Sequence, residues 1–162
     1  MSKEFVFMRD LISKYHPTFK ASADLVKFGL ENPHHFYIEG LVEETLAAVG
    51  DLKFVDAEGY DFLPDYSDSK TVSVNEKSYY AEIGGVENKI GPLRISLYNP
   101  ITESLAFFFV PKSHLSRVKL PCYGVNSHKE RVKFSYSKVC KDSYGWFDDY
   151  RVGTFEELAL AR

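Results

Sequence analysis

The sequence is poor in the residues that staple small proteins together or place them in membranes. Only two cysteines, Cys122 and Cys140, occur in 162 residues, and their spacing is not that of a structural zinc site. No apolar stretch approaches the ~18 residues of a membrane span. The first ten residues carry charges too early for a secretory signal. Neither a Walker loop nor a GxGxxG fingerprint is present. We therefore expect a cytoplasmic protein with reduced thiols.

Aromatic residues, in contrast, are abundant. The chain contains 13 Phe and 11 Tyr, and hydrophobic residues make up 44% of it. This composition excludes intrinsic disorder, and the length suits one folded unit with its own core. We expect a single domain over residues 1–162.

The net charge of -3 hides two segments of opposite sign. Residues 39–68 contain nine carboxylates and one lysine, whereas residues 112–141 contain eight basic residues and one acid. A carboxylate-rich segment attracts a cation, and a basic segment attracts an anion such as phosphate. The small net charge therefore does not exclude a nucleic acid as partner.

The periodicity of apolar residues changes along the chain from helical to alternating. Helices are predicted at about 5–15, 19–30 and 36–49, the last ending before Gly50. Short strands are predicted at 54–55, 60–63, 71–74, 79–83, 93–98, 105–110 and 131–136, with 93–98 and 105–110 forming a hairpin. A last helix starts at Thr154 with the capping pattern Thr-Phe-Glu-Glu, in which Glu157 reaches back to Thr154. The expected fold class is α+β (α/β-like), with N-terminal helices, a central mixed sheet and a short C-terminal helix.

The segment from Gly59 to Val74, GYDFLPDYSDSKTVSV, combines short strands with acids and one lysine. Asp61, followed by Asp68 and Lys70 as a DxK triplet, resembles the PD-(D/E)xK motif of the restriction-endonuclease-like nucleases. The resemblance implies that Asp61 and Asp68 hold Mg²⁺, with Mn²⁺ as a substitute, and that Lys70 orients or activates the attacking water. A preceding helix in such enzymes often adds a glutamate, for which Glu43 and Glu44 are placed, and we favour Glu44.

The chemistry of these residue types supports the same interpretation. Hydrolysis of a phosphodiester needs a cation that polarises the phosphoryl group and acidifies a water molecule. Mg²⁺ binds one or two carboxylates and fills its remaining positions with water and phosphate oxygens. An ammonium group nearby compensates the negative charge that develops in the reaction.

Other registers of the motif remain open, because Asp61 and Asp68 are closer in sequence than is usual for it. Asp65 or Asp68 could combine with Glu87 and Lys89 as an ExK triplet. Alternatively, Lys70 could act with Glu82 as a displaced acid.

Seven basic residues are candidates for contacts with a nucleic-acid backbone: Lys89, Arg94, Lys112, Lys119, Lys129, Arg131 and Lys133. Together with the acidic motif they predict a Mg²⁺-dependent endonuclease of restriction or mobile-element type. We expect it to cleave double-stranded DNA and to act as a homodimer, since two strands need two active sites. The alternatives are a non-catalytic interaction protein, of phage origin for example, that binds protein or nucleic acid, and a small-molecule binding module.

Overall fold

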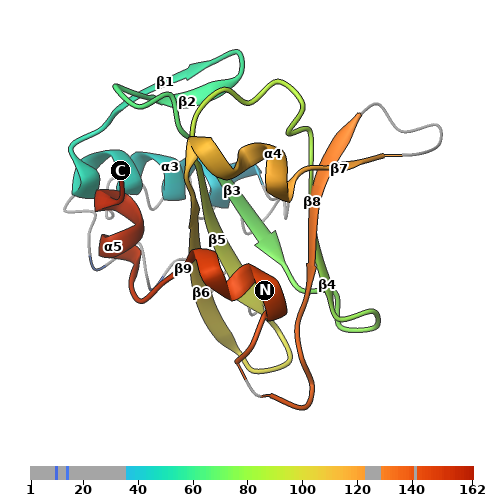
Figure 1. Cartoon of the computed structure of the whole chain (residues 1–162). Coiled ribbons are helices and arrows are strands. Elements are labelled where there is room, and N and C mark those ends of the chain that lie inside the picture. The colour runs from blue at the N-terminus through green and yellow to red at the C-terminus, as the bar shows by residue number, and fades with distance from the viewer. Residues whose placement is uncertain (1–9, 11–13, 15–35, 123–128, 141) are drawn as a thin grey trace.

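The structure is a computed structural model that describes Asp10, Lys14 and residues 36–122, 129–140 and 142–162 (Figure 1). Helices and mixed β-sheets together form an α+β fold that ends in a short helix, as predicted. The helices expected at 5–15 and 19–30 lie outside the described residues. No helix of the described part is both long and apolar enough to cross a membrane.

The main sheet has four strands in the order β3-β5-β6-β9. Their bounds are Asp68–Ser73, Leu93–Asn99, Ser104–Val110 and Arg151–Val152. Strands β3 and β5 run parallel, with Asp68 opposite Leu93, and the other pairs are antiparallel. The predicted hairpin is confirmed as β5–β6, whose turn is held by Asn99 Oδ1 accepting from the backbone N–H of Ile101 at 3.0 Å.

A second sheet and a two-stranded ribbon complete the strands. The second sheet has the order β4-β8-β7, with the bounds Tyr80–Gly84, Glu130–Ser135 and Leu120–Pro121. The ribbon pairs β1 (Lys53–Ala57) with β2 (Tyr60–Leu63). Short helical turns lie at η1 (Lys112–His114), α4 (Leu115–Val118) and η2 (Gly145–Tyr150). Sequence periodicity did not predict these turns, because each is too short to repeat an apolar pattern.

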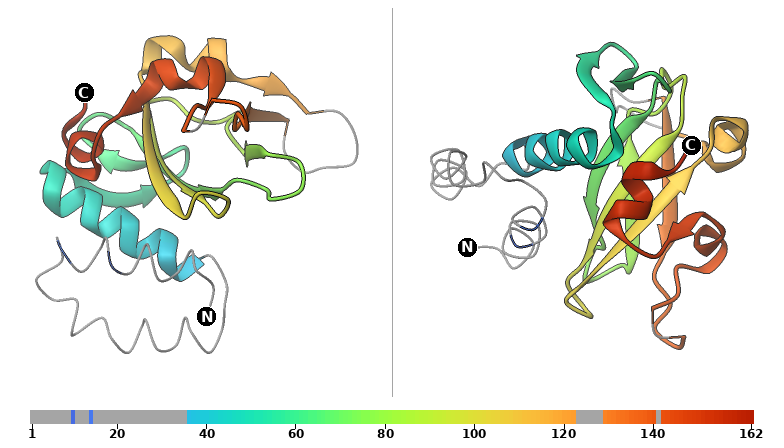
Figure 2. Two further views of the ribbon diagram at one scale, coloured as in Figure 1. Left: turned by 90° about the horizontal axis from the view of Figure 1, so that it is seen from below. Right: turned by 90° about the vertical axis from the view of Figure 1, so that its left-hand side faces the viewer.

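The main sheet is covered on both faces. Leu93, Ile95 and Leu97 of β5 pack into a core shared with β4, β8 and η2. Tyr98 belongs instead to a second core, formed with α3 (Phe36–Gly50) and α5 (Phe155–Leu160). In the right-hand view of Figure 2, α3 and β8 accordingly lie on opposite sides of the main sheet.

Helix α5 starts where the capping pattern predicted. Thr154 Oγ1 accepts a hydrogen bond from the Glu157 N–H at 3.1 Å. The Glu157 carboxylate accepts from the N–H of Gly153, at 2.7 Å, rather than from that of Thr154. Both bonds satisfy backbone donors that the first turn of a helix leaves open.

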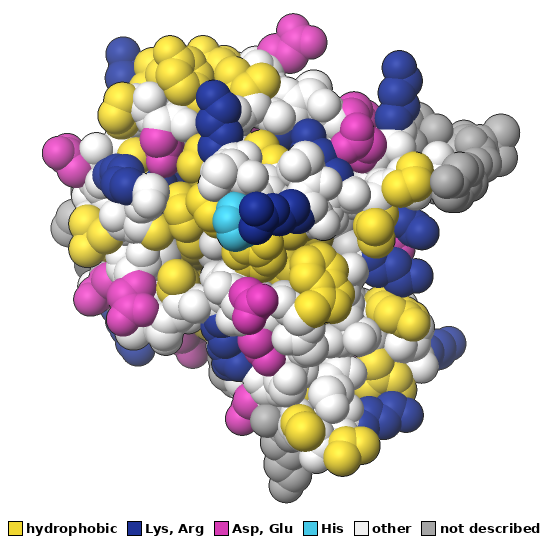
Figure 3. All heavy atoms as spheres, in the orientation of Figure 1, with side chains coloured by type: hydrophobic (Ala, Val, Ile, Leu, Met, Phe, Trp, Pro, Cys, Tyr) yellow, Lys and Arg dark blue, Asp and Glu magenta, His cyan; other side chains and the backbone are white. Residues whose placement is uncertain are grey.

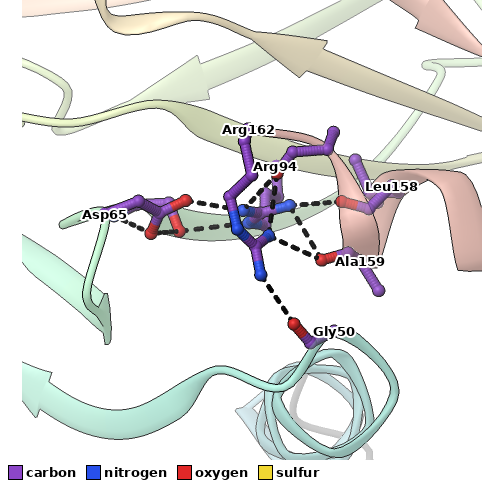
Figure 4. A network of polar contacts seen from close by, with 8 residues as sticks. Gly50, Asp65, Arg94, Leu158, Ala159 and Arg162 are labelled. Carbon is purple, nitrogen blue, oxygen red and sulfur yellow. Dashed lines mark hydrogen bonds and ion pairs between the residues drawn. The ribbon is translucent and has the colours of Figure 1, made fainter.

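Two arginines attach the end of α5 to the rest of the fold (Figure 4). Arg94, on β5, donates to the carbonyl oxygens of Leu158, Ala159 and Ala161, and to Asp65 Oδ2 at 2.6 Å. Arg162 donates to the Gly50 carbonyl oxygen at 2.6 Å and thereby reaches the end of α3. The network holds α3, α5, β5 and the β2–β3 connection against one another, which fixes the frame around the acidic residues.

Candidate functional site

A hollow of about 390 Å³ lies between α3, the β1–β2 ribbon and the first residues of β3. Its lining consists of Glu39, Gly40, Glu43, Phe54, Asp56, Ala57, Asp61, Asp68, Ser69, Lys70 and Lys89. The structure therefore brings together the three residues of the predicted motif, Asp61, Asp68 and Lys70. It also adds acids from α3 and a second lysine.

A tight connection between β2 and β3 makes the short spacing of the motif possible. The backbone N–H groups of Asp61 and Phe62 both donate to the Ser67 carbonyl oxygen, at 2.9 and 3.0 Å. The Ser69 N–H donates to Asp61 Oδ2 at 2.8 Å. These bonds fold the chain back directly after the turn, so that Asp61 and Asp68 meet although they are seven positions apart.

Asp68 is the centre of the charged cluster. It is 2% exposed, and its Oδ1 lies 2.7 Å from Lys89 Nζ. Its Oδ2 is buried without a hydrogen bond and has Lys70 Nζ at 3.4 Å. Burial of an ionised carboxylate is costly unless cations stand close to it, and here two lysines supply them.

Two neighbouring carboxyl groups are hard to ionise. Burial and the charge of Asp68 raise the pKa of Asp61 to about 7, against the opposing effects of the Ser69 N–H and Lys89. Burial and the charges of Asp61, Glu39, Asp56 and Asp68 raise the pKa of Glu43 to about 8. Acids crowded in one hollow hold their protons in this way until a cation replaces them.

The helix supplies a different glutamate from the one favoured on sequence. Glu44 is exposed and does not line the hollow, whereas Glu39 and Glu43 do. Successive helical residues point about 100° apart, so that residues four positions apart share a face and adjacent ones do not. The spacing of Glu39 and Glu43 therefore indicates the face of the helix that lines the hollow, and Glu44, favoured on sequence, lies outside it.

Lys89 reaches the hollow from the loop between β4 and β5. That loop passes so close to the β2–β3 turn that a Cβ on Gly91 would lie 2.1 Å from the Tyr66 carbonyl oxygen. Of the alternative motif registers, Glu87–Lys89 contributes its lysine but not its acid, since Glu87 does not line the hollow. Glu82 is exposed and pairs with Arg131 at 2.7 Å, so it is not the displaced acid.

The predicted nucleic-acid contacts separate into several groups. Arg94 is 0% exposed within its network, so the structure corrects its prediction as a contact to the nucleic-acid backbone. On the second sheet, Arg131 pairs with Glu82, and the ammonium of Lys133 stands over the Tyr80 ring at 4.2 Å. Lys129 is exposed next to β8. Lys112 and Lys119 line a second hollow, which they share with Lys89.

The acids of the first hollow suit a small, hard cation that keeps much of its hydration shell. In the part of the chain that the structure describes, no group of three or more His, Cys, Asp or Glu side chains is arranged to hold a metal ion by itself. Mg²⁺, however, commonly takes only one or two carboxylates from a protein and uses water and phosphate oxygens for the rest. The buried Asp68 Oδ2, which lacks a hydrogen bond, fits such a partial donor set together with Asp61.

No protein-family model matches the chain, and no curated protein matches its sequence. The resemblance to the PD-(D/E)xK nucleases therefore depends on the residues of this chain alone.

Proposed function

We propose that the chain is a Mg²⁺-dependent endonuclease that hydrolyses phosphodiester bonds of DNA, with the first hollow as its active site. The observation that carries the proposal is the meeting of Asp61 and the buried Asp68 with two lysine side chains in one open hollow. A protein gains no stability from crowding carboxyl groups whose pKa values rise as a result. Sites of this kind are typical of metal binding and acid–base chemistry.

Each residue of the hollow has a role in this proposal. Asp61 and Asp68 would hold Mg²⁺, which when bound polarises the phosphoryl group and lowers the pKa of a bound water. Lys70, two residues after Asp68 on β3 and thus on the same side of the strand, orients the attacking water and balances the charge that develops on the phosphate.

Glu43 contributes a carboxyl group that still carries its proton at neutral pH, because its pKa is raised to about 8. In that state its hydroxyl can donate a hydrogen bond to a water molecule or a phosphate oxygen in the hollow. After losing the proton it can accept one from the attacking water. It therefore takes the role that sequence reasoning gave to Glu44.

The test is cleavage of supercoiled plasmid and of a labelled linear duplex in Mg²⁺, in Mn²⁺ and in EDTA. We expect cleavage only with a divalent cation, and its loss by at least about a hundredfold in Asp68→Asn and Lys70→Met. Glu43→Gln and Glu44→Gln form a matched pair, since they are adjacent on α3 and only Glu43 lines the hollow. Thermal unfolding of each variant shows whether it is folded.

The outcomes separate the candidate functions. Intact substrates in both Mg²⁺ and Mn²⁺, with a folded protein, would refute the nuclease and leave a non-catalytic binding protein. Cleavage that survives Asp68→Asn would instead refute the site. Because both strands of a duplex must be cut, we further propose a homodimer, which light scattering of the protein on a short duplex would detect.

A further inference from the structure

We propose that the second hollow binds the phosphate backbone of duplex DNA beside the bond that is cut. This inference rests on the proposed function, because the strand held here is the one that enters the first hollow. The second hollow has a volume of about 540 Å³ and lies between α4, β7 and the loop before β5. Lys89, Lys112 and Lys119 are among the residues that line it.

Lys89 connects the two hollows, because its side chain lines both of them. The two hollows therefore adjoin at this side chain. Successive phosphates of a strand must leave the first hollow in some direction, and the acids there repel them. The second hollow, which adjoins the first at Lys89, offers Lys112 and Lys119 to those phosphates.

The two hollows differ in charge, as expected if the first binds a metal ion and the second binds phosphates. The first is lined by five carboxyl groups, of which Glu43 keeps its proton at neutral pH, and by two lysines. The second has Lys112 and Lys119 against one acid, Glu130. Lys89 also lines it, but its Nζ pairs with Asp68 at 2.7 Å. Glu130 Oε2 lies 3.9 Å from Lys119 Nζ, a long contact on the surface that a phosphate can replace at small cost. In Figure 3, basic and acidic side chains lie next to each other on the surface between α4 and β7.

The shape and chemistry of the second hollow favour a polymer rather than an enclosed small ligand. Ile90 and Leu120, also in its lining, are 50% and 41% exposed and offer apolar contact to sugars that lie between phosphates. Lysines act as mobile point charges without the fixed fork of arginine, so they suit contacts to a backbone that do not depend on base sequence. We therefore assign Lys112 and Lys119 to phosphates that flank the cleaved one.

The experiment measures binding separately from cleavage. The affinity of the full chain for a fluorescent duplex is followed by anisotropy in EDTA at several salt concentrations. For Lys112→Ala/Lys119→Ala we expect an affinity at least about tenfold lower. The slope of log affinity against log salt should be smaller by about 2, because two phosphate contacts are lost.

Lys77→Ala/Lys138→Ala is the matched control, because it removes the same charge. Lys77 precedes β4 and Lys138 follows β8, and Tyr80 pairs with Ser135, so both lie at the end of the second sheet opposite Glu130. In Mg²⁺, Lys112→Ala/Lys119→Ala should show a raised KM with little change in kcat. The inference would be overturned if Lys112→Ala/Lys119→Ala had the same affinity and salt slope as the wild type. It would also be overturned if the control variant lost as much affinity as Lys112→Ala/Lys119→Ala.

Failure of the inference can be told apart from failure of the proposed function. If the wild type binds the duplex through Lys112 and Lys119 but never cuts it, the binding role of the second hollow is supported and the nuclease proposal is refuted. If the wild type cuts DNA and Lys112→Ala/Lys119→Ala keeps its affinity for the duplex, the binding role of the second hollow is refuted and the proposed function is not. A wild type that does not bind the duplex in EDTA or in Ca²⁺ overturns the inference.

Discussion

Lys89 Nζ lies 2.7 Å from Asp68 Oδ1, although 21 positions separate the two residues in the chain. The contact joins the loop before β5 to the first residue of β3, and it neutralises one oxygen of a carboxylate that is almost fully buried. Asp68 thus has two lysine partners, one from its own strand and one from the loop.

Removal of Lys89 should change the pH dependence of the proposed reaction. Lys89 lowers the pKa of Asp61, so in Lys89→Met the pKa of Asp61 rises further above about 7. A metal site that needs ionised Asp61 then works only at higher pH. We expect the acid limb of the kcat/KM profile in Mg²⁺ to shift towards alkaline pH, by about one unit or less. An unchanged limb would show that Lys89 does not act on Asp61 in solution, and Lys77→Met controls for the lost charge.

The stability of the metal-free protein should fall as the pH rises from 5 to 8. The pKa values of Asp61 and Glu43 are raised to about 7 and 8, so the folded state holds more protons than the unfolded state over this range. The free energy of unfolding then decreases by up to about 1.4 kcal/mol per pH unit for each proton retained. The Asp65 pKa is lowered in the folded state, so the ionised group stabilises the fold throughout this range, and its contribution is lost only at more acidic pH. Urea unfolding at each pH measures the slope, which Asp61→Asn and Glu43→Gln should flatten and Glu44→Gln should not.

Addition of a divalent cation should reverse this trend. Mg²⁺ has to displace the protons that Asp61 and Glu43 retain, so it binds more strongly at pH 8 than at pH 5. We expect the Mg²⁺-induced rise in Tm to be larger at pH 8 and to disappear in Asp61→Asn/Asp68→Asn. A rise of the same size in this double variant would place the cation elsewhere.

Substitution of Gly91 should detach Lys89 from the site. A Cβ at this position would lie 2.1 Å from the Tyr66 carbonyl oxygen, and backbone cannot yield as a flexible side chain can. We expect Gly91→Ala to lose about 2 kcal/mol or more of stability, as overpacked sites do, together with activity. Gly40→Ala is the comparison for stability alone, because nothing lies within 4 Å of its added Cβ and Ala is the better helix former. Equal unfolding free energies for the two variants would contradict the close approach.

Loss of the Arg94 side chain should destabilise the frame around the site. Arg94→Met removes the ion pair with Asp65 and the donor to the Leu158 carbonyl oxygen, and broken buried ion pairs cost about 3–5 kcal/mol. Asp65→Leu/Arg94→Met should cost less than the sum of the single changes, because it removes both charges. Arg117→Met, at an exposed arginine, should change stability by less than about 0.5 kcal/mol. Urea unfolding measures all four variants, and an additive double variant would contradict the pairing.

Local patterns of the sequence were sufficient for most elements. The apolar repeat predicted α3, and the alternation at 93–98 and 105–110 predicted the β5–β6 hairpin. Thr154 marked the first turn of α5. The β3 strand, however, begins at Asp68 rather than at the predicted Thr71, because its polar first residues pair with β5 along the whole strand. A polar residue inside a sheet contradicts the apolar pattern that strand prediction uses.

Arg94 was misplaced because Gly91 and Pro92 predict a loop over residues 89–94, whose basic side chains are expected to contact a nucleic-acid backbone. In the structure Arg94 lies in β5, between Leu93 and Ile95. Helix α5 covers the Arg94 face of β5, and the guanidinium donates to the carbonyl oxygens of Leu158 and Ala159 in that helix. Whether an alternating strand has one face in water depends on elements distant in the sequence.

The sequence by itself determined the candidate chemistry, since Asp61, Asp68 and Lys70 are close enough in the chain for one turn to bring them together. Tertiary structure decided which further groups join them. Glu43 replaces Glu44 because the buried face of α3 sets the rotation of the helix, and Lys89 arrives because Gly91 allows two backbones to approach. Contacts between distant segments follow from packing and from the pairing of buried charges, and a linear pattern does not record these.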